Sequence, residues 1–298
     1  MLQDDCLAFY VAQSKYTDFG DFLPLIKNVP NDIEEIFKYS RNVIEHFHGI
    51  NKNKIKPRRL LDVDIRYNKD ILNRIKQCGY NDITNDIAFE DRIVGTCRTQ
   101  AVFTCGILRA KGIPARTRYK YCTYFIEDFN HEQVLVEYWC HKKNRWLLGD
   151  PAMNHEVLQS KGISIHFDLC DVPQDKSMSI AAAWTNCRNK KTAPYFYGAY
   201  SKENKYNGYE HIHRKLYQDL ACLNKIEVVE WDRWGIFLYN DTLDTEELSY
   251  CDDLATVLNV ANLQDDALYR NINELKPHSI PVKGISASPF NADYEIIF

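Results

Sequence analysis

Apolar positions along the first hundred residues follow helical spacing. They predict one amphipathic helix from Asn31 to about His48, capped by Asn31 with Glu34 three residues on, and a second helix from Lys69 to Cys78. A third helix is expected to open at Cys97 and to end at Gly112, because glycine favours the residue that follows a helix.

The period changes to that of strands after this helix. Segments rich in Tyr, Val, Thr and Trp predict strands over Ala115–Ile126, His131–Cys140 and Arg145–Asp150, with a hairpin loop at His141–Asn144. A helix followed by antiparallel strands indicates an α+β layer arrangement. Beyond Pro173 the pattern is helical again, over Met178–Cys187, Lys215–Lys225 and Asp244–Val260.

The chain is long enough, and apolar enough, to bury one large core. No internal repeat, low-complexity segment or flexible linker interrupts it, so a single domain over residues 1–298 is expected. Its parts are an N-terminal helical part at 1–80, a core at 81–153 and a C-terminal helical extension at 174–298.

Composition narrows the class of protein. The net charge of −4 comes from well-mixed acidic and basic residues, so we expect neither nucleic acid nor a membrane as a partner. The basic run from Lys52 to Arg59 is the main exception, either a solvated loop or a phosphate-binding patch. Without a secretory signal or a spanning segment, the protein is expected in the cytoplasm. Its ten cysteines, scattered and without a CxxC pair, are expected to be reduced.

Three residues between positions 97 and 150 suggest thiol chemistry. Cys97 lies at a predicted helix N-terminus, where free backbone N–H groups and the helix dipole favour a thiolate. His131 begins a strand and Asp150 ends one, so the order matches a nucleophile, a base and a group that orients the base. Each also has a simpler interpretation: a buried cysteine, a structural histidine and a turn aspartate. Cys105, two turns along the helix, is expected to be core.

These residues lie in segments that resemble the transglutaminase-like superfamily. The similar segments span roughly Asn81 to Met153, and a weaker similarity is found at Trp184 and from Leu220 to Gly235. The motifs that carry the resemblance are Gly95-Thr96-Cys97-Arg98, Ile107 to Arg116, Glu137-Tyr138-Trp139 and Trp146 to Pro151. The resemblance implies a papain-like core in which Cys97, His131 and Asp150 form a catalytic triad. It also implies similarity to uncharacterised bacterial transglutaminase-like proteins.

The base position departs from the family pattern. The family histidine stands four residues before the strand glutamate, which in this chain is the position of Gln133 before Glu137. His131 lies two residues earlier, on the same strand face but about 7 Å away. A turn centred on Lys142 and Lys143 would pair Asp150 with Leu135 and leave His131 about 13 Å away, whereas a turn at Cys140 and His141 would pair Asp150 with His131.

Two functions follow as hypotheses. The first is a Cys97 acyl-enzyme that hydrolyses or transfers a peptide, amide or thioester substrate, small or carrier-bound: a peptidase, amidase or acyltransferase. The Cys97 N–H would supply part of an oxyanion hole. The second is a degenerate binding or scaffolding module, because Gln133 stands where the base is expected. No cofactor is implied.

The other histidines and the tryptophans carry weaker hypotheses. The i, i+2 pairs His46/His48 and His211/His213 lack further ligands at a suitable spacing, so no metal site is expected. His141 and His155 are alternative bases, more typical of solvated loops. Three tryptophans could cover a cleft or fill the core: Trp184, Trp231 and Trp234.

Overall fold

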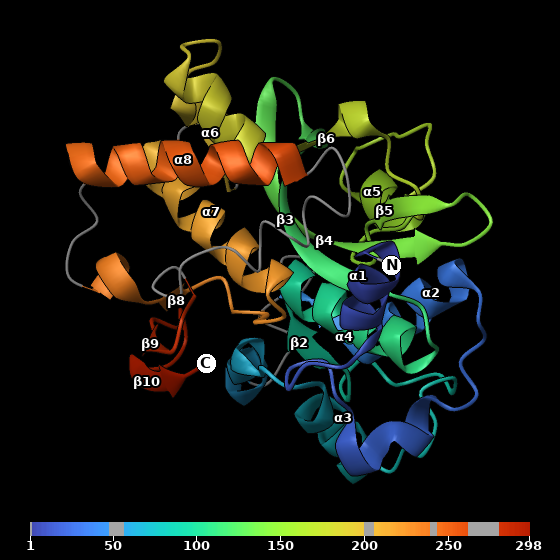
Figure 1. Cartoon of the computed structure of the whole chain (residues 1–298). Helices are drawn as coiled ribbons and strands as arrows, with labels where there is room; N and C mark the ends of the chain where they lie inside the picture. The colour runs from blue at the N-terminus through green and yellow to red at the C-terminus, as the bar shows by residue number, and fades with distance from the viewer. Residues whose placement is uncertain (1, 48–56, 200–205, 239–242, 262–279) are drawn as a thin grey trace.

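A sheet of long antiparallel strands forms the centre of the computed structural model, which describes residues 2–47, 57–199, 206–238, 243–261 and 280–298. Its strand order is β5-β4-β3-β6, and β7 pairs with β4 in parallel. The strands are β3 (Ala115–Ile126), β4 (Phe129–Cys140), β5 (Arg145–Gly149), β6 (Ser177–Ser179) and β7 (Tyr197–Gly198). Helices pack around this sheet, as Figure 1 shows. The α+β fold class predicted from the sequence is confirmed.

Two hairpins set the register of the central strands. β3 and β4 turn at Asp128, whose φ of 55° lies in the left-handed region that aspartate tolerates. β4 and β5 pair Val136 with Gly149 and Cys140 with Arg145, so the second turn is centred on Lys142 and Lys143. Of the two registers considered from the sequence, the structure has the one that aligns Asp150 with Leu135 and not with His131.

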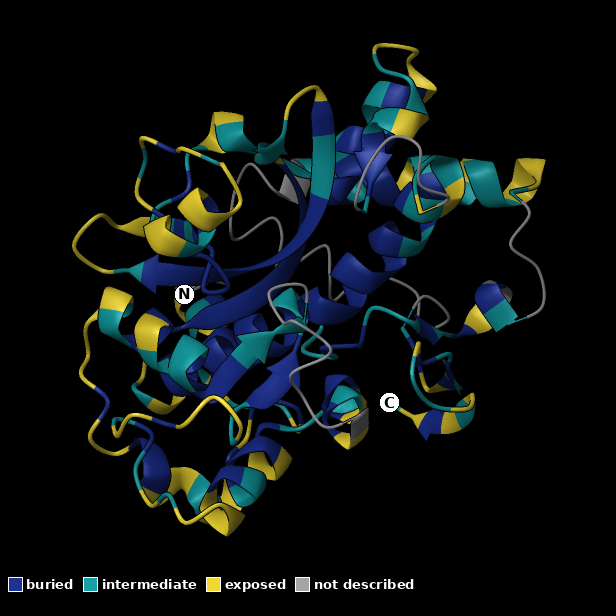
Figure 2. Ribbon diagram, turned by 180° about the vertical axis from the view of Figure 1, so that it is seen from behind, coloured by how far each residue is buried: buried dark blue, intermediate teal, exposed yellow. Residues whose placement is uncertain are grey.

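Helix α4 (Cys97–Ala110) packs on β3 and β4 and is buried along almost its whole length. In Figure 2 the long strands and the helices packed on them are largely buried. Three helices surround α4: α1 (Leu2–Val11), α2 (Ile33–Val43) and α3 (Asn68–Gln77). Helices α2, α3 and α4 share an apolar cluster with the sheet that includes Phe37, Leu72, Phe103 and Val136.

A second apolar cluster joins the sheet to three later helices, α6 (Ile180–Arg188), α7 (Tyr209–Leu223) and α8 (Thr245–Ala261). Trp184 of α6 belongs to this cluster and has no exposed surface, and its ring lies 5.7 Å from that of Tyr209 on α7. The three helices contact one another, and α6 and α7 also contact β3. The C-terminal part therefore closes over the sheet, on the left-hand and upper side in Figure 1.

Short elements complete the fold. β1 (Ile44–His46) and β2 (Ile93–Gly95) form a parallel pair, and β8 (Asp232–Arg233), β9 (Lys283–Ser286) and β10 (Tyr294–Ile297) form a small antiparallel sheet. The remaining elements are α5 (His155–Ser160) and the 3-10 turns η1 (Gly20–Ile26), η4 (Pro57–Asp64), η5 (Gln174–Lys176), η6 (Pro194–Phe196) and η7 (Gly235–Leu238).

The predicted helix from Asn31 to His48 was too long at both ends. Asp32, not Asn31, caps α2 by accepting a hydrogen bond from the N–H of Glu35, and the helix ends at Val43. The chain then turns extended and pairs with β2, a partner about fifty residues later that local periodicity does not reveal. The C-terminal region, expected to be helical, likewise contains the β8-β9-β10 sheet.

Three further expectations from the sequence concern the cysteines, membrane-spanning helices and the basic run. All ten cysteines are free, as predicted for reduced thiols. No helix in the described ranges is long and apolar enough to cross a membrane. Residues 52–56 of the basic run and His48 lie outside the described residues. Arg59, at the end of that run, is buried and donates to the carbonyl of Phe89 at 3.1 Å.

Candidate functional site

Cys97 is the first residue of α4, as the sequence predicted. Thr96 caps the helix through a reciprocal pair of bonds with Thr99: the Thr96 hydroxyl accepts from the Thr99 N–H, and the Thr99 hydroxyl accepts from the Thr96 N–H. This capping box fixes where the helix starts. It therefore holds the Cys97 thiol at the helix end, where backbone N–H groups have no partner within the helix.

The surroundings of Cys97 favour a neutral thiol. The residue keeps some solvent-accessible surface but packs against both the α6–α8 cluster and a smaller one around Met153 and Leu158. Burial raises the pKa of the thiol well above its ordinary value, and the carboxyl group of Glu230 raises it further. A backbone hydrogen bond from Val134 acts in the opposite direction but is the weaker influence. At neutral pH the sulfur is therefore protonated.

Asp150 lies just beyond the end of β5 and is fully buried. Its carboxylate accepts hydrogen bonds from the Tyr124 hydroxyl at 2.7 Å, from the side-chain amide of Gln133 and from the N–H of Ala152 at 3.1 Å. Burial raises the pKa of this carboxyl to about 6, and the three hydrogen bonds limit the rise because they stabilise the charged form.

Gln133, not His131, occupies the position beside Asp150. Its Nε2 lies 3.1 Å from both carboxylate oxygens, and the side chain is buried. This contact follows from the register of β4 and β5, which leaves His131 two residues farther along the strand. The predicted contact between the His131 ring and Asp150 is therefore replaced by one from Gln133, and no bulge in this part of β4 closes the gap.

His131 has a different environment. It pairs with Cys122 on β3 and with Gly198 on β7, and its ring lies 5.2 Å from that of Phe125. Within the described residues, its buried Nδ1 has no hydrogen-bond partner. Burial lowers the pKa of the imidazole, so the ring is neutral at pH 7.

Acidic residues, rather than a histidine, are the charged groups that shift the pKa of Cys97. Glu230 follows α7 and β4 carries Glu132, which contacts Lys215 Nζ at 2.6 Å and His211 Nε2 at 3.1 Å. Burial would raise the pKa of Glu132, but the charge of Lys215 and the hydrogen bond from His211 outweigh burial and lower the pKa, so the carboxylate stays ionised. Burial raises the pKa of Glu230, which hydrogen-bonds Thr96.

Three of these site residues were missed from the sequence: Tyr124, Glu132 and Glu230. Tyr124 and Glu132 lie in predicted strands, but nothing in their spacing indicates what they contact. Glu230 lies far along the chain and reaches the site only through tertiary packing. The offset of Gln133 from Glu137 was the one available signal.

The other cysteine, tryptophan and histidine residues singled out from the sequence are not among the contacts of Cys97 and Asp150 described above. Cys105 is fully buried in the α4 cluster, and Trp184 and Trp234 are core residues. His141 lies in the exposed β4–β5 turn and His155 begins α5.

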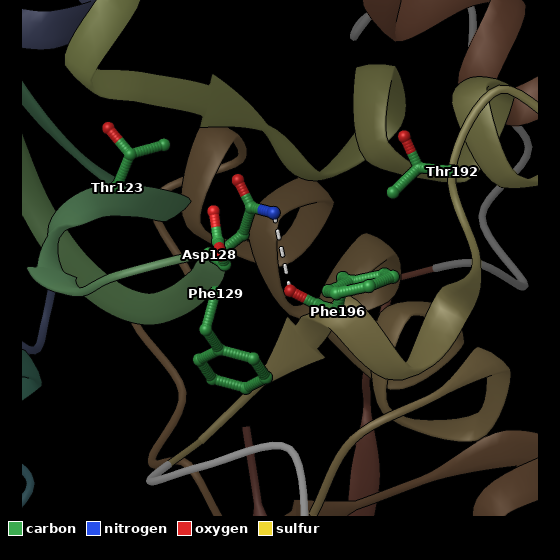
Figure 3. Close-up of a pocket in the computed structure, with 6 residues that line it drawn as sticks. Thr123, Asp128, Phe129, Thr192 and Phe196 are labelled. Atoms are coloured by element: carbon green, nitrogen blue, oxygen red, sulfur yellow. Dashed lines mark hydrogen bonds between the residues drawn. The ribbon is translucent and has the colours of Figure 1, made fainter.

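A cavity of about 560 Å³ lies at the tip of the β3–β4 hairpin, beside η6. Asn130 donates to the carbonyl of Phe196 at 3.2 Å. Figure 3 shows the side chains that line the cavity. Its lining consists of Thr123, Asp128, Phe129, Asn130, Thr192 and Phe196. Cys97, Gln133 and Asp150 are not among these, so this cavity and the thiol site are separate features.

Comparison with known proteins agrees with the resemblance seen in the sequence. Residues 56–151 match the model of the transglutaminase-like superfamily, a range that contains Cys97, Gln133 and Asp150 and begins before the predicted core boundary at Asn81. The match supports a cysteine-dependent enzyme as the general class from which this domain comes. No curated protein matches the chain significantly.

One solved structure is similar over part of its length. It belongs to a candidate cysteine protease from Cytophaga hutchinsonii, with 15% sequence identity and a TM-score of 0.32. The aligned region covers 50% of this chain and 42% of that protein, so this chain corresponds to less than half of the protein's length.

Proposed function

We propose that this chain, whose residues 56–151 form a transglutaminase-like domain, is a catalytically degenerate binding module of that superfamily. In this proposal the Cys97 end of α4 holds a peptide, amide or thioester group without fast covalent turnover. The observation that carries the proposal is the contact of Gln133 with Asp150 at the position of the expected base.

The chemistry of a side-chain amide is the reason. A glutamine cannot accept the thiol proton or return one to a leaving group, so it cannot serve as general base and acid. The Asp150 carboxylate still orients the residue beside it, but that residue carries no proton-accepting nitrogen. With its pKa raised by burial and by Glu230, Cys97 lacks the thiolate that attack on a carbonyl requires.

The features that bind a carbonyl group are retained. Cys97 begins α4, whose first N–H groups have no partner within the helix, and the Val134 N–H hydrogen-bonds the sulfur; donors of this kind can hold a carbonyl oxygen. Apolar residues of the Met153 and Leu158 cluster pack beside them. Binding without reaction therefore requires no change in this geometry.

The pH dependence of alkylation at Cys97 tests the proposal. Iodoacetamide labelling of the Cys97 peptide, followed by mass spectrometry, should show a midpoint above ~8.5, the value of a free thiol. Gln133→His restores an imidazole beside Asp150 and should increase the labelling rate of Cys97 at pH 7 by about tenfold or more. Cys105, buried on the same helix, provides an internal reference, and Cys97→Ala identifies the peptide.

A midpoint well below the free-thiol value in the wild-type protein would overturn the binding module. A second result would also overturn it: Gln133→His does not raise the rate of Cys97 alkylation at pH 7, and a thiol-reactive acyl probe labels the wild-type protein rapidly.

A second candidate is thiol-dependent acyl transfer with Glu230 as the base. Two observations favour it: Cys97 is retained at a helix N-terminus, and Glu230 is the ionisable group with the largest effect on its thiol. Burial raises the pKa of Glu230, and its Oε2 has no hydrogen-bond partner among the described residues. Such a carboxylate could accept the thiol proton.

Glu230→Gln separates the two candidates. If Glu230 is the base, acyl-probe labelling of Cys97 disappears in this variant. In the binding module the carboxyl group only opposes thiolate formation, so the same variant labels slightly faster.

A further inference from the structure

Three side chains with different donor atoms meet between α7 and α8. His213 comes from α7, while Glu247 and Cys251 lie four residues apart on one face of α8. One ligand atom from each lies within 4.8 Å of the other two. This cluster is distinct from the Cys97 site and shares no residue with it.

The cluster is buried and centred on one oxygen. His213 is 2% exposed, Cys251 has no exposed surface and the side chain of Glu247 is 15% exposed. Glu247 Oε1 lies 2.6 Å from His213 Nε2, 3.4 Å from Cys251 Sγ and 2.9 Å from the hydroxyl of Tyr217. Three potential ligands therefore surround the Glu247 oxygen, which is itself a fourth, and all four come from two helices.

Aromatic rings pack around the imidazole of His213. The His213 ring lies 4.7 Å from that of Phe237, 5.5 Å from that of Tyr217 and 6.3 Å from that of Trp184. Trp184 is in turn held by a hydrogen bond from its Nε1 to Asp252 at 2.8 Å. Such packing restricts rotation of the imidazole, so its Nε2 stays directed at Glu247.

We propose that His213, Glu247 and Cys251 bind a zinc-type divalent cation, with Tyr217 or water as the fourth ligand. Imidazole nitrogen, thiolate sulfur and carboxylate oxygen are the donors that zinc prefers. Calcium and magnesium take oxygen ligands, so the thiol and the imidazole disfavour them.

The spacing suits a tetrahedral ion after a small adjustment. Zinc bonds of about 2.0 to 2.3 Å place neighbouring ligand atoms roughly 3.3 to 3.8 Å apart. Cys251 Sγ already lies 3.4 Å from Glu247 Oε1. The distance between His213 Nε2 and Glu247 Oε1, now 2.6 Å, needs to increase by less than about 1 Å.

Charge and protons balance in this step. The ion forms bonds to the neutral His213 nitrogen, the Glu247 oxygen and the Cys251 sulfur, and the thiol proton passes to solvent. A dication then compensates one carboxylate and one thiolate. The neighbouring Asp252 is already paired with Arg188 at 2.8 Å, so no further acidic charge is left uncompensated there.

The two helices supply ligands from distant parts of the sequence. His213 and Glu247 are separated by 34 residues, which is why the sequence revealed no ligand spacing. A bound ion would link α7 to α8 and stabilise the packing of these helices on the sheet, because an ion that binds only the folded state raises the stability of that state.

Cobalt(II) is the probe for this site, since it replaces zinc and gives a thiolate-to-metal charge-transfer band. Titration of the chelator-treated full chain should give that band at a stoichiometry of about one cobalt per chain, and zinc should remove it. In Cys251→Ser the band is lost, and in Glu247→Gln, which keeps the size of the side chain, cobalt affinity falls by about tenfold or more. Cys78→Ser, at an exposed thiol, leaves both unchanged.

Circular dichroism of each variant confirms that it is folded. The absence of the band in the wild-type protein overturns the proposal. So does a band that persists in folded Cys251→Ser, because the thiolate ligand then lies elsewhere. Neither result affects the assignment of Cys97, whose alkylation is measured separately.

Discussion

At the scale of single residues, Asp150 shows how burial and hydrogen bonding compete. The carboxyl group has no exposed surface, and burial raises its pKa from 3.8 to about 6 although Tyr124, Gln133 and the Ala152 N–H all donate to it. Both side-chain donors require an acceptor oxygen, which the ionised form supplies. Asp150 is therefore charged at neutral pH and holds the Gln133 amide in place.

The raised pKa of Asp150 makes stability depend on pH. A carboxyl whose folded pKa exceeds its unfolded pKa contributes stability that is complete below about pH 4 and is lost as pH rises through about 6. The shift of roughly two units corresponds to about 3 kcal/mol. Relative to Asp150→Asn, the wild-type free energy of unfolding should fall by about that amount between pH 4 and pH 7 in urea titrations.

The control for this prediction is Asp175→Asn, at an exposed position. Its stability should follow the wild-type curve across the same range. Parallel curves for wild type and Asp150→Asn would show that this carboxyl has an ordinary pKa.

At the scale of elements, α4 determines how the N-terminal segments pack. Asn68, which begins α3, donates through its side chain to the carbonyls of Thr17 and Val102 at 3.1 and 3.2 Å, and the Asn68 amide and the Thr17 carbonyl lie against Gly106 of α4. A Cβ at Gly106 would lie 2.5 Å from the Thr17 carbonyl oxygen and closer still to the Asn68 amide. Glycine is therefore required by close approach, not by backbone conformation.

Gly106→Ala sets two effects against each other. Alanine favours a helix interior by about 1 kcal/mol over glycine, but overpacking against a fixed backbone carbonyl costs roughly 1–3 kcal/mol. We expect net destabilisation of about 1 kcal/mol or more, measured by urea unfolding. Gln77→Ala on the exposed face of α3 is the control and should be neutral or slightly stabilising. A stabilised Gly106→Ala would show that α3 yields to the methyl group.

At the scale of the whole molecule, one buried ion pair joins three distant parts of the chain. Arg109 on α4 and Glu227 after α7 have side chains with no exposed surface and lie 3.0 Å apart. The N-terminal segment joins them, because Thr17 accepts from Arg109 at 3.0 Å and Ser14 donates to Glu227 at 2.7 Å. The segment leading to Glu230 is thereby held against the α4 helix that carries Cys97.

Breaking this pair should cost far more than removing it. Arg109→Met leaves the Glu227 carboxylate buried without its cation, and we expect a loss of about 3–5 kcal/mol in the free energy of unfolding. Adding Glu227→Gln removes the charge, so the double variant should be more stable than the sum of the two single losses by about 1 kcal/mol or more. Additive losses would indicate that water solvates Glu227.

The sequence alone determined the local pieces of this protein. The spacing around Cys97 placed it at the start of α4, and the run from Ala115 to Asp150 predicted three strands and the hairpin loop at His141–Asn144, which the structure confirms. The resemblance to the transglutaminase-like superfamily, whose histidine stands four residues before the strand glutamate, added that Gln133 stands at the position of the base. Apart from that resemblance, the evidence was local. These signals depend on periodicity, capping and turn residues within a few positions of one another.

Only the tertiary structure decided which of these pieces meet. The register of β4 and β5 assigned Asp150 to Gln133, and packing brought Glu230 to Cys97. It also ended α2 at Val43 and set His213 against Cys251. The physical reason is that contacts between distant segments depend on how whole faces of helices and strands are buried together, and neighbouring residues do not encode that choice.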